Sequence, residues 1–411
     1  MYNVISMVGL GYIGLPTATV LASKGIKVIG VDVNQHAVDT INRGEIHIVE
    51  PGLEALVSQV VRSGHLTAVT GPVPADAFII AVPTPFKEGH VPDLSYIHAA
   101  VQSIAPVLKK GNLVILESTS PVGATEQMEK WLAELRPDIS FPSIAGEDAD
   151  VQIAYCPERV LPGNVLHELS ANDRIVGGMT KKASNMAAAL YGIFVSGECL
   201  KTDARTAEMA KLTENSFRDL NIAFANELSL ICDHLNINVW ELIPLANRHP
   251  RVNILSPGPG VGGHCIAVDP WFIVNSAPEQ ARLIRTAREV NDQKPHYVVE
   301  QVKKLASQFE APVVACFGLA FKANIDDLRE SPAVEIVAEL LDCGFGEVLA
   351  VEPHVQKLPS ILEGKAELVG VESALARADV LVMLVDHKQF ASINASAIEG
   401  RPVVDTRGVW K

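Results

Sequence analysis

The sequence lacks the features of several large protein classes. No apolar run approaches the ~20 residues that span a bilayer. Lys and Arg together number 34 against 48 Asp and Glu, which leaves a formal net charge of -14. Such an acidic chain is poorly suited to neutralising nucleic-acid phosphates or to binding an anionic membrane surface. We therefore expect neither a nucleic acid nor a membrane as partner.

Metal-ligand spacing is also absent. The six cysteines are scattered without a CxxC pair, and the histidines show no H-x-x-x-H pattern, so we expect no metal. The first residues, MYNVISMVGLG, contain no basic leader and no cleavage site. This start predicts no signal peptide and a cytoplasmic protein.

The length of the chain indicates more than one domain. At 411 residues it exceeds the ~250 to 300 residues at which a single core stops growing. Residues 3–9 form an apolar strand, a helix follows, and residues 26–32 form the next strand, which makes a βαβ unit. Apolar strands are also predicted at 75–85 and 112–123, and both end in polar loops, where ligands of parallel sheets bind.

The middle and the end of the chain follow a different pattern. Residues 203–235 contain no Pro or Gly and predict one long helix, with Asp203 as its N-cap, which we expect to connect the domains and to form a dimer. A second α/β segment starts at 311, with a helix at 332–343 and three later strands, at 347–353, 378–387 and 402–408. Its first turn, GLAFK, lacks the spaced glycines that cradle a pyrophosphate. The predicted fold class is α/β, with two Rossmann-like doubly wound parallel-sheet domains joined by a long central helix.

A dinucleotide-binding pattern opens the chain. Gly9, Gly11 and Gly14 in GLGYIG follow a strand and precede a helix, and Asp32 ends the next strand. The glycines permit a tight turn, close approach of a pyrophosphate and close packing of the helix, while Asp32 would bind ribose hydroxyls. No Arg or Lys follows Asp32 before Arg43, so we predict NAD and not NADP. Thr84 and Thr119, at strand ends, are further candidate cofactor contacts, although either could simply cap its strand.

The stretch GPGVGGHCIAVDP, residues 258–270, places Cys265 at the end of a glycine-rich loop. Beside NAD, a thiolate could add to an aldehyde as a thiohemiacetal and lose a second hydride to become a thioester, which water would hydrolyse. The glycines would let the backbone approach the sugar and the nicotinamide closely. Asp269 is better suited to accept a proton than to activate the thiol. Alternatively, the cysteine is a core residue; direct pairing with His264 is not expected, because adjacent side chains point apart.

Lys211 and Asn215 lie four residues apart on the long helix. This spacing puts them on one face, where an ammonium and an amide could stabilise a developing oxyanion. Two polar residues on a solvated helix face would show the same spacing, so position alone leaves both interpretations open.

Several motifs together extend the interpretation. GLGYIGLP, ESTSPVG, YCPERVLPG, AEMAKLTENSFR, GVGGHCIAVDP and GLAFKANIDDLRESP occur in the order, and over almost the whole length, of the UDP-glucose/GDP-mannose dehydrogenase family, which the chain resembles. The resemblance implies that Cys265 is the covalent nucleophile. It implies oxyanion and water positioning by Lys211 and Asn215, a base relay through Asp269, and hydrolysis of the thioester by Glu158 through a water held by Thr119.

The resemblance also implies binding residues. Lys322 and Arg407 would contact the UDP-sugar, Arg251 would reach the neighbouring site of a homodimer, and Arg329 would lie near the cofactor. The full predicted cofactor set is Gly9, Gly11, Tyr12, Ile13, Gly14, Asp32, Thr84, Thr119 and Arg329. The full predicted substrate set is Glu158, Arg159, Val160, Leu161, Lys211, Asn215, Arg218, Arg251, Asn253, Gly262, Lys322 and Arg407.

The implied organisation and reaction are specific. Residues 1–200 would bind NAD, 201–308 would form a central helical dimerisation segment with the cysteine loop, and 309–411 would bind the UDP-sugar. Around Cys265 the sequence departs from glucose-type members of the family, and the resemblance implies UDP-N-acetyl-D-mannosamine as substrate, oxidised at C6 to UDP-N-acetyl-D-mannosaminuronate for surface polysaccharide such as enterobacterial common antigen. The alternatives are UDP-glucose or UDP-N-acetylglucosamine with the same chemistry, a two-electron 3-hydroxyacid dehydrogenase, and a non-catalytic NAD-sensing module.

Overall fold

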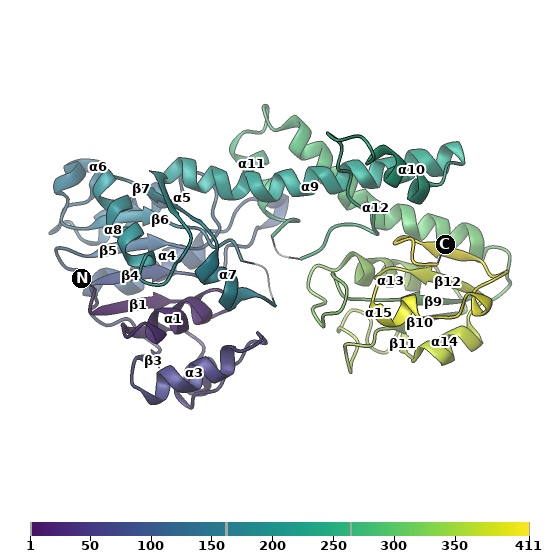
Figure 1. Ribbon diagram of the computed structural model, residues 1–411, viewed down its shortest axis with the longest axis horizontal. Coiled ribbons are helices and arrows are strands. Elements are labelled where there is room, and N and C mark those ends of the chain that lie inside the picture. The colour runs from purple at the N-terminus through teal and green to yellow at the C-terminus, as the bar shows by residue number, and fades with distance from the viewer. Residues whose placement is uncertain (1, 161–162, 264, 411) are drawn as a thin grey trace. The chain divides into compact units, whose positions relative to one another are not determined.

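The computed structural model describes residues 2–160, 163–263 and 265–410 (Figure 1). The chain divides into two compact units, Met1–Glu214 and Asn215–Lys411. The division falls inside α9 (Ala204–Leu235), so one helix contributes to both units. Asp203 accepts hydrogen bonds from the backbone N–H and the hydroxyl of Thr206, at 2.9 and 2.6 Å, which confirms it as the N-cap of this helix.

An eight-stranded sheet forms the centre of the first unit. Its order, β3-β2-β1-β4-β5-β6-β7-β8, is parallel except for the antiparallel pair β6–β7. The strands are β1 (Val4–Val8), β2 (Lys27–Val31), β3 (Leu66–Val69), β4 (Ala77–Ile80), β5 (Leu113–Leu116), β6 (Gln152–Tyr155), β7 (Arg174–Gly178) and β8 (Cys199–Asp203). The order reverses between β1 and β4, the switch point at which doubly wound sheets bind ligands.

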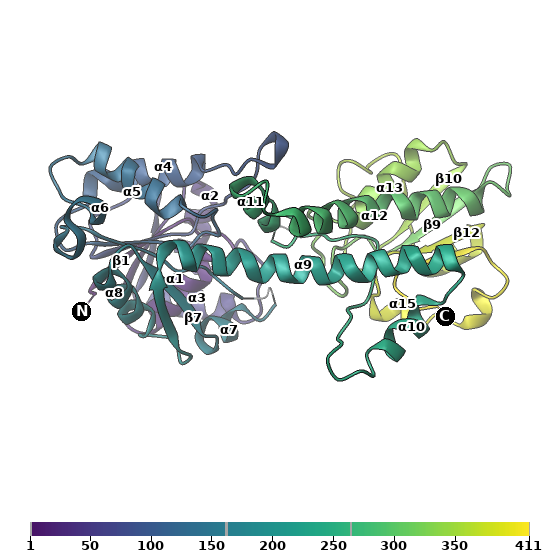
Figure 2. The same ribbon diagram turned by 90° about the horizontal axis from the view of Figure 1, so that it is seen from above.

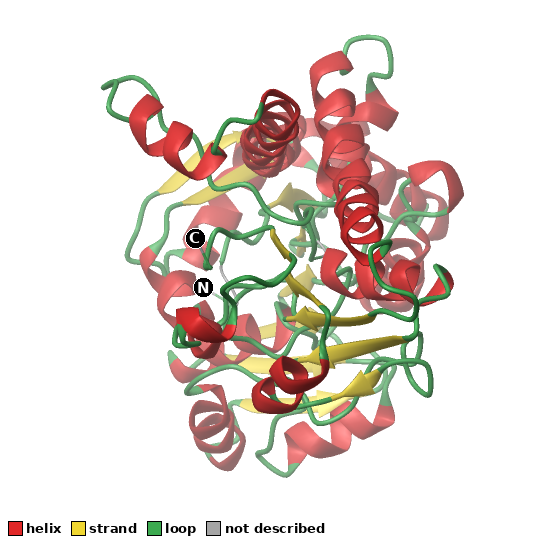
Figure 3. Cartoon of the chain, turned by 90° about the vertical axis from the view of Figure 1, so that its right-hand side faces the viewer, coloured by secondary structure: helices red, strands yellow, loops and turns green. Residues whose placement is uncertain are grey.

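Helices cover both faces of this sheet, because successive residues of its buried strands supply two separate cores. One core joins the sheet to α1 (Gly14–Ser23), α3 (Leu53–Arg62) and α8 (Lys181–Tyr191). The other joins it to α4 (Ser95–Ile104), α5 (Ala124–Leu135) and the first turns of α9. The remaining helices of more than one turn are α2 (Gln35–Asn42) and α7 (Val165–Ala171). Figure 3 shows the strands of the chain in yellow and the helices in red.

The second unit repeats the design on a smaller scale. Its sheet is β11-β10-β9-β12-β13, all parallel: β9 (Val313–Phe317), β10 (Glu347–Val351), β11 (Glu367–Leu368), β12 (Val380–Met383) and β13 (Val403–Asp405). Helices α12 (Arg282–Ala306) and α13 (Pro332–Asp342) pack on one face, and α14 (Val371–Arg377) and α15 (Lys388–Ala391) on the other. Helices α10 (Val239–Ala246) and α11 (Asp269–Ser276) complete the unit.

These sheets confirm the predicted fold class. Figure 2 shows α12 running beside the C-terminal part of α9, to which buried hydrogen bonds join it, so the second unit carries its own section of the long helix. In the part of the chain that the structure describes, no helix is both long enough and apolar enough to cross a bilayer.

Candidate active site

The glycine turn after β1 is shaped as a dinucleotide cradle. Gly9 has φ +93°, and a Cβ there would lie 2.5 Å from the carbonyl oxygen of Ala81. A Cβ on Gly14 would lie 1.9 Å from the carbonyl oxygen of Gly9, whereas one on Gly11 would meet nothing within 4 Å. Gly9 and Gly14 are therefore required by the fold, and Gly11 faces open space at the N-terminus of α1. This is the arrangement that a bound pyrophosphate needs.

Asp32 closes the same turn from β2. Its Oδ2 accepts a hydrogen bond of 2.9 Å from the backbone N–H of Leu10, and its Oδ1 accepts one of 2.9 Å from Asn34. The carboxylate thus lies directly beside the glycine turn, where ribose hydroxyls of a dinucleotide would reach it. Of the residues between the glycines, Tyr12 is exposed and Ile13 is partly buried.

The predicted threonines meet at the ends of β4 and β5. The hydroxyl of Thr84 donates to the backbone carbonyl of Thr119, and both residues are partly exposed. Ser118, one residue earlier, donates to the carbonyl of Val82 at 2.7 Å. These bonds join two neighbouring strand ends at the switch edge, so the Thr84 hydroxyl has a structural role whether or not it also contacts a cofactor.

Glu158 follows β6 at the same edge of the sheet. It is 7% exposed, and its Oε2 accepts a hydrogen bond of 2.6 Å from the backbone of Val160. Arg159 points to α9, where it forms an ion pair with Glu214 at 2.7 Å, and it also donates to the carbonyl of Asp173. The loop is therefore tied to the long helix. Leu161, predicted beside them, lies outside the described residues.

Lys211 is placed by a contact that the sequence did not predict. Glu208, one turn earlier on α9, accepts hydrogen bonds from the backbone of Gly123 and Thr125 and from the Thr125 hydroxyl, at 2.6 to 2.8 Å. It caps the N-terminus of α5 in place of the missing side chain of Gly123. Lys211, only 8% exposed, is therefore held on the buried side of α9, and not on a solvated face.

The cysteine loop belongs to the second unit. Cys265 is exposed and begins a turn in which its carbonyl accepts from Val268 and Asp269, the latter at 2.9 Å. Asp269, 3% exposed, is the first residue of α11, and its Oδ2 accepts a hydrogen bond of 2.5 Å from the Asn215 amide. One short turn thus connects the thiol, the acid and the helix amide. His264 lies outside the described residues.

The loop glycines make close contacts with the protein itself. A Cβ on Gly262 would lie 2.5 Å from the carbonyl oxygen of Glu330 and 2.8 Å from Pro332, and one on Gly258 would lie 2.8 Å from the guanidinium of Arg407. We predicted from sequence that the glycines admit the sugar and the nicotinamide. Packing against the loop after β9 gives Gly262 a second reason to be glycine.

A buried polar network fixes the other end of this loop, and sequence reasoning missed it. Asn226 on α9 accepts from the backbone of Gly258 at 2.9 Å and donates to Asn291 on α12, which in turn donates to Asp219. Arg288 forms an ion pair with Asp219 at 2.6 Å, both 1% exposed. The signal available was Arg288 among the apolar residues of α12, because a buried charge requires a partner.

Other predicted binding residues also belong to the second unit. Arg407 forms an ion pair with Asp386 at 2.8 Å beside Gly258, and Arg329 is hydrogen-bonded to Asp327. The remaining predicted substrate residues of this unit are exposed: Arg218, Arg251, Asn253 and Lys322. The predicted substrate residues therefore include four exposed cationic side chains or amides able to meet an anionic ligand.

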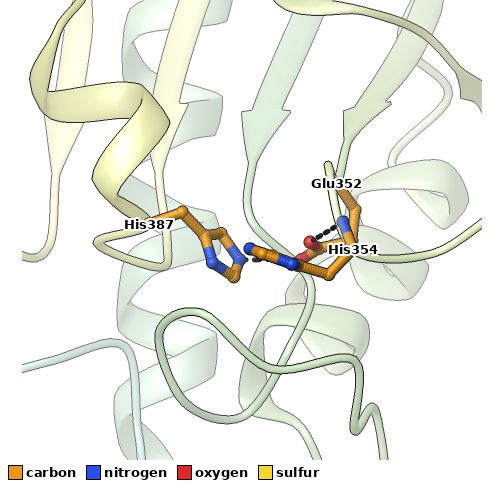
Figure 4. Close-up of side chains that lie close together, drawn as sticks. All are labelled: Glu352, His354 and His387. Carbon is orange, nitrogen blue, oxygen red and sulfur yellow. Dashed lines mark hydrogen bonds and ion pairs between the residues drawn. The ribbon is translucent and has the colours of Figure 1, made fainter.

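The turn after β9 shows why the second sheet has lost the dinucleotide pattern. Glu352 directly follows β10, as Asp32 directly follows β2, and accepts from the backbone of Leu319 and Ala320 at 2.8 and 3.1 Å. His387 donates to the same carboxylate at 2.9 Å, and both side chains are buried (Figure 4). Burial opposes ionisation, but these hydrogen bonds together lower the pKa of Glu352. An acid covered in this way is not available to a ribose.

His354 joins these two residues in a group with metal-ligand side chains, which the sequence spacing did not reveal because the members come from two strand ends. However, His387 Nδ1 accepts a 2.9 Å hydrogen bond from the backbone N–H of Asn324, so its proton lies on Nε2, facing Glu352. Neither nitrogen of His387 then offers a lone pair to an ion. The hydrogen bonds explain the cluster as a structural lock on the turn.

The comparisons with known proteins agree with this architecture. Residues 3–195 match the NAD binding domain of the UDP-glucose/GDP-mannose dehydrogenase family, 205–293 its central domain and 315–411 its UDP binding domain. An NDP-N-acetyl-D-galactosaminuronic acid dehydrogenase of Ralstonia nicotianae is 66% identical over 100% of this chain and 96% of its own length. A UDP-N-acetyl-D-mannosamine dehydrogenase of Salmonella typhi is 65% identical, with 100% of both chains covered.

A solved structure shares the fold over almost the whole of both chains. The UDP-D-ManNAc dehydrogenase of Pyrococcus horikoshii superimposes with a TM-score of 0.89 at 39% identity, covering 99% of this chain and 96% of that one. The glycine cradle and Asp32 lie within the residues that match the NAD binding domain. On this agreement of sequence, fold and site, the chain belongs to the UDP-glucose/GDP-mannose dehydrogenase family.

Proposed function

We propose that this enzyme oxidises C6 of UDP-N-acetyl-D-mannosamine from the alcohol to the carboxylate, using two NAD and one water. The observation that carries the proposal is the turn in which Cys265 accepts from the backbone of Asp269 while Asp269 accepts from Asn215. An acid and an amide held within a few residues of an exposed thiol suit the oxidation of an alcohol followed by capture of the aldehyde.

NAD, when bound, accepts one hydride in each of the two oxidations. In the first, Lys211 and Asp269 relay the proton of the C6 hydroxyl as the aldehyde forms. The thiolate of Cys265 then adds to the aldehyde carbon, and the resulting oxyanion is stabilised by Lys211 and Asn215. Loss of the second hydride leaves a thioester. Glu158 accepts a proton from water, which attacks the thioester carbon, so that the carboxylate is released and the thiol is regenerated.

The nucleotide would bind at the second unit. Lys322 and Arg407 carry the positive charge that a diphosphate requires, and Arg407 is already positioned beside Gly258 of the cysteine loop. We also propose that residues 1–200 bind NAD, that 201–308 form the central segment, and that 309–411 bind the UDP-sugar. We also propose a cytoplasmic enzyme that supplies uronate for surface polysaccharide such as enterobacterial common antigen.

The choice of sugar is tested directly. The similar relatives from Ralstonia and Salmonella carry different sugars in their names. NADH formation should therefore be compared for UDP-N-acetylmannosamine, its galacto analogue, UDP-N-acetylglucosamine, UDP-glucose and GDP-mannose. We expect the highest kcat/KM with the manno sugar and two NADH per acid formed. A ratio of one NADH would exclude the thioester route, and a higher kcat/KM with another sugar would reassign the substrate.

Replacement of Cys265 by Ala tests the covalent step. In this mechanism C265A forms no net acid, whereas a two-electron 3-hydroxyacid dehydrogenase would keep its turnover. An NAD-sensing module would bind NAD and form no NADH with any of the sugars, in wild type as in the variant.

We also propose a homodimer through α9 in which Arg251 completes the neighbouring site. Phe217, Phe224 and Ile231, spaced by seven residues on α9, are 70%, 50% and 46% exposed, an apolar stripe that a partner helix would cover. Mixing R251A with C265A tests the shared site, because each inactive chain supplies what the other lacks. Random pairing should restore about a quarter of wild-type activity; no recovery in a mixture shown to exchange subunits would contradict the cross-dimer role.

A further inference from the structure

A buried charged cluster lies behind Glu158 in the first unit. Arg174, at the start of β7, is 4% exposed; its Nη1 lies 3.3 Å from Oε1 of Glu117, and its Nη2 lies 3.9 Å from Oε1 of Glu158. Glu117 follows β5 and is 1% exposed. The antiparallel pairing of β6 with β7, continued past Tyr155, brings Arg174 opposite Glu158. One guanidinium therefore faces two carboxylates.

Aromatic groups hold the guanidinium in this position. It lies 4.7 Å from the ring centroid of Tyr191 and 5.6 Å from that of Phe194, and the Tyr191 hydroxyl donates to Oε1 of Glu117 at 3.1 Å. The other carboxylate oxygen of Glu117, Oε2, is buried and has no hydrogen-bond partner among the described residues. Three ionisable groups in a sheet core cost more free energy than apolar residues of similar size. A purely structural role would not offset this free-energy cost.

The protonation of Glu117 determines how the single positive charge is shared. Burial raises the pKa of Glu117 to about 7, so near neutral pH a large fraction of this carboxyl is uncharged. In that form it competes weakly for the cation, and the charge of Arg174 is directed to Glu158. Glu158, in contrast, has its Oε2 fixed by the backbone of Val160. Its carboxylate thus accepts a backbone hydrogen bond on one oxygen and faces the guanidinium with the other, at the edge of the sheet that bears the predicted cofactor residues.

We propose that Arg174 is a positioning residue that orients the Glu158 carboxylate for hydrolysis of the Cys265 thioester. The inference rests on the function proposed above. It assigns Arg174 to the water-dependent step alone, because Arg174 acts through Glu158 and not through the residues of hydride transfer.

Rapid-quench measurements on Arg174→Gln, Arg174→Lys and wild type separate the two steps. For R174Q we expect the first NADH to form within about threefold of the wild-type rate, while acid release slows ~100-fold, in the range of a lost general base. An acyl-enzyme at Cys265 should then accumulate and be visible by intact mass. R174K keeps the positive charge but lacks the forked donors of the guanidinium. Its rate of acid release should therefore be partly restored, to ~10-fold below that of wild type.

Two further variants complete the design. Arg205→Gln removes an exposed arginine of the same unit, paired with Glu126, and should leave both rates unchanged. Glu117→Gln, which resembles the protonated acid, should release the acid product within about threefold of the wild-type rate. If R174Q instead slows NADH formation and acid release in parallel, Arg174 is only structural and the inference is wrong, while the proposed function stands. If wild type forms one NADH per product and no acyl-enzyme, the proposed function and the inference fail together.

Discussion

Asn215 and Asp269 are joined by a 2.5 Å hydrogen bond from the amide Nδ2 to the carboxylate Oδ2. Because Asp269 also begins α11 and its N–H donates to the carbonyl of Cys265, this bond fixes the turn that carries the thiol to the C-terminal section of α9. The amide of Asn215 is thereby committed to the acid, and any contact it makes with substrate would be additional.

Asn215→Asp would place a second carboxylate against Asp269. Two carboxyl groups at this distance cannot both ionise, so the pKa of one rises above its unfolded value. Such a group stabilises the fold less as pH rises through its folded pKa. We expect the melting temperature of N215D to fall below that of wild type at pH 8 and to approach it near pH 5. The control is Asn221→Asp, whose amide donates to the carbonyl of Phe217 on the same helix and not to an acid; a pH-independent difference for N215D would contradict the contact.

The glycine cradle permits a test that separates binding from folding. Gly11→Ala places its methyl group in open space, whereas Gly14→Ala would force a Cβ to 1.9 Å from the Gly9 carbonyl. We expect G11A to unfold like wild type but to bind NAD at least ~10-fold more weakly, because the methyl group occupies the space of the pyrophosphate. G14A should lose ~1 to 3 kcal/mol or more of unfolding free energy. Calorimetry and NAD titration measure the two effects; unchanged NAD affinity in G11A would place the dinucleotide elsewhere.

Chelation should have no effect on this enzyme. Both nitrogens of His387 are engaged, one by the backbone of Asn324 and the other by Glu352, so the cluster has too few available lone pairs for tight ion binding. After dialysis against EDTA we expect the same melting temperature and the same NADH rate as before. A loss that Zn²⁺ restores would show that the histidine changes its tautomer to bind metal.

Because of Lys294 on α12, we expect the stability of the fold to rise with pH, whereas N215D should lose stability as pH rises. It is 6% exposed, donates to Ser229 at 2.6 Å, and burial lowers its pKa from 10.5 to about 8. Between these values the unfolded chain binds more protons than the folded one, so the stability of wild type rises with pH relative to Lys294→Met, by at most about 3 kcal/mol. Urea unfolding at pH 7.5, 9 and 10 measures this difference. Lys304→Met, exposed on the same helix, should show no such trend.

Local patterns in the sequence predicted much of this molecule. The spacing of Gly9, Gly11 and Gly14 before Asp32 predicted a cradle whose geometry the structure contains, and Asp203 was recognisable as an N-cap from its place before an uninterrupted helix. Both signals depend on residues within one βαβ unit or one helical turn. The physical rules that govern them act over short stretches of chain, so a single sequence is enough.

Contacts between distant strands could not be predicted in this way. Glu117 and Arg174 meet across 57 positions, and Asn226 and Asn291 across 65. Each looks like an ordinary polar residue in the sequence, because a partner is specified by the sheet order and by helix packing and not by spacing. Glu352 and His387 are the same case, and for this reason histidine spacing along the chain did not reveal their cluster.

The sequence explained only part of the reason why residue 262 is glycine. Gly262 also allows the sharpest test of the cysteine loop. A Cβ there would lie 2.5 Å from the Glu330 carbonyl, 2.8 Å from Pro332 and 2.9 Å from Phe321. Since backbone atoms cannot rotate away, Gly262→Ala must displace the loop, and with it Cys265 three residues later. Misplacement of a nucleophile by about 1 Å costs ~100-fold in rate, so we expect kcat to fall by that order while NAD affinity is unchanged. The matched control, Gly370→Ala, adds a methyl group in the same unit where nothing lies within 4 Å, and it should retain wild-type kcat. Retention of kcat by G262A as well would mean that the loop reaches its active position by leaving the surface of Glu330 and Pro332.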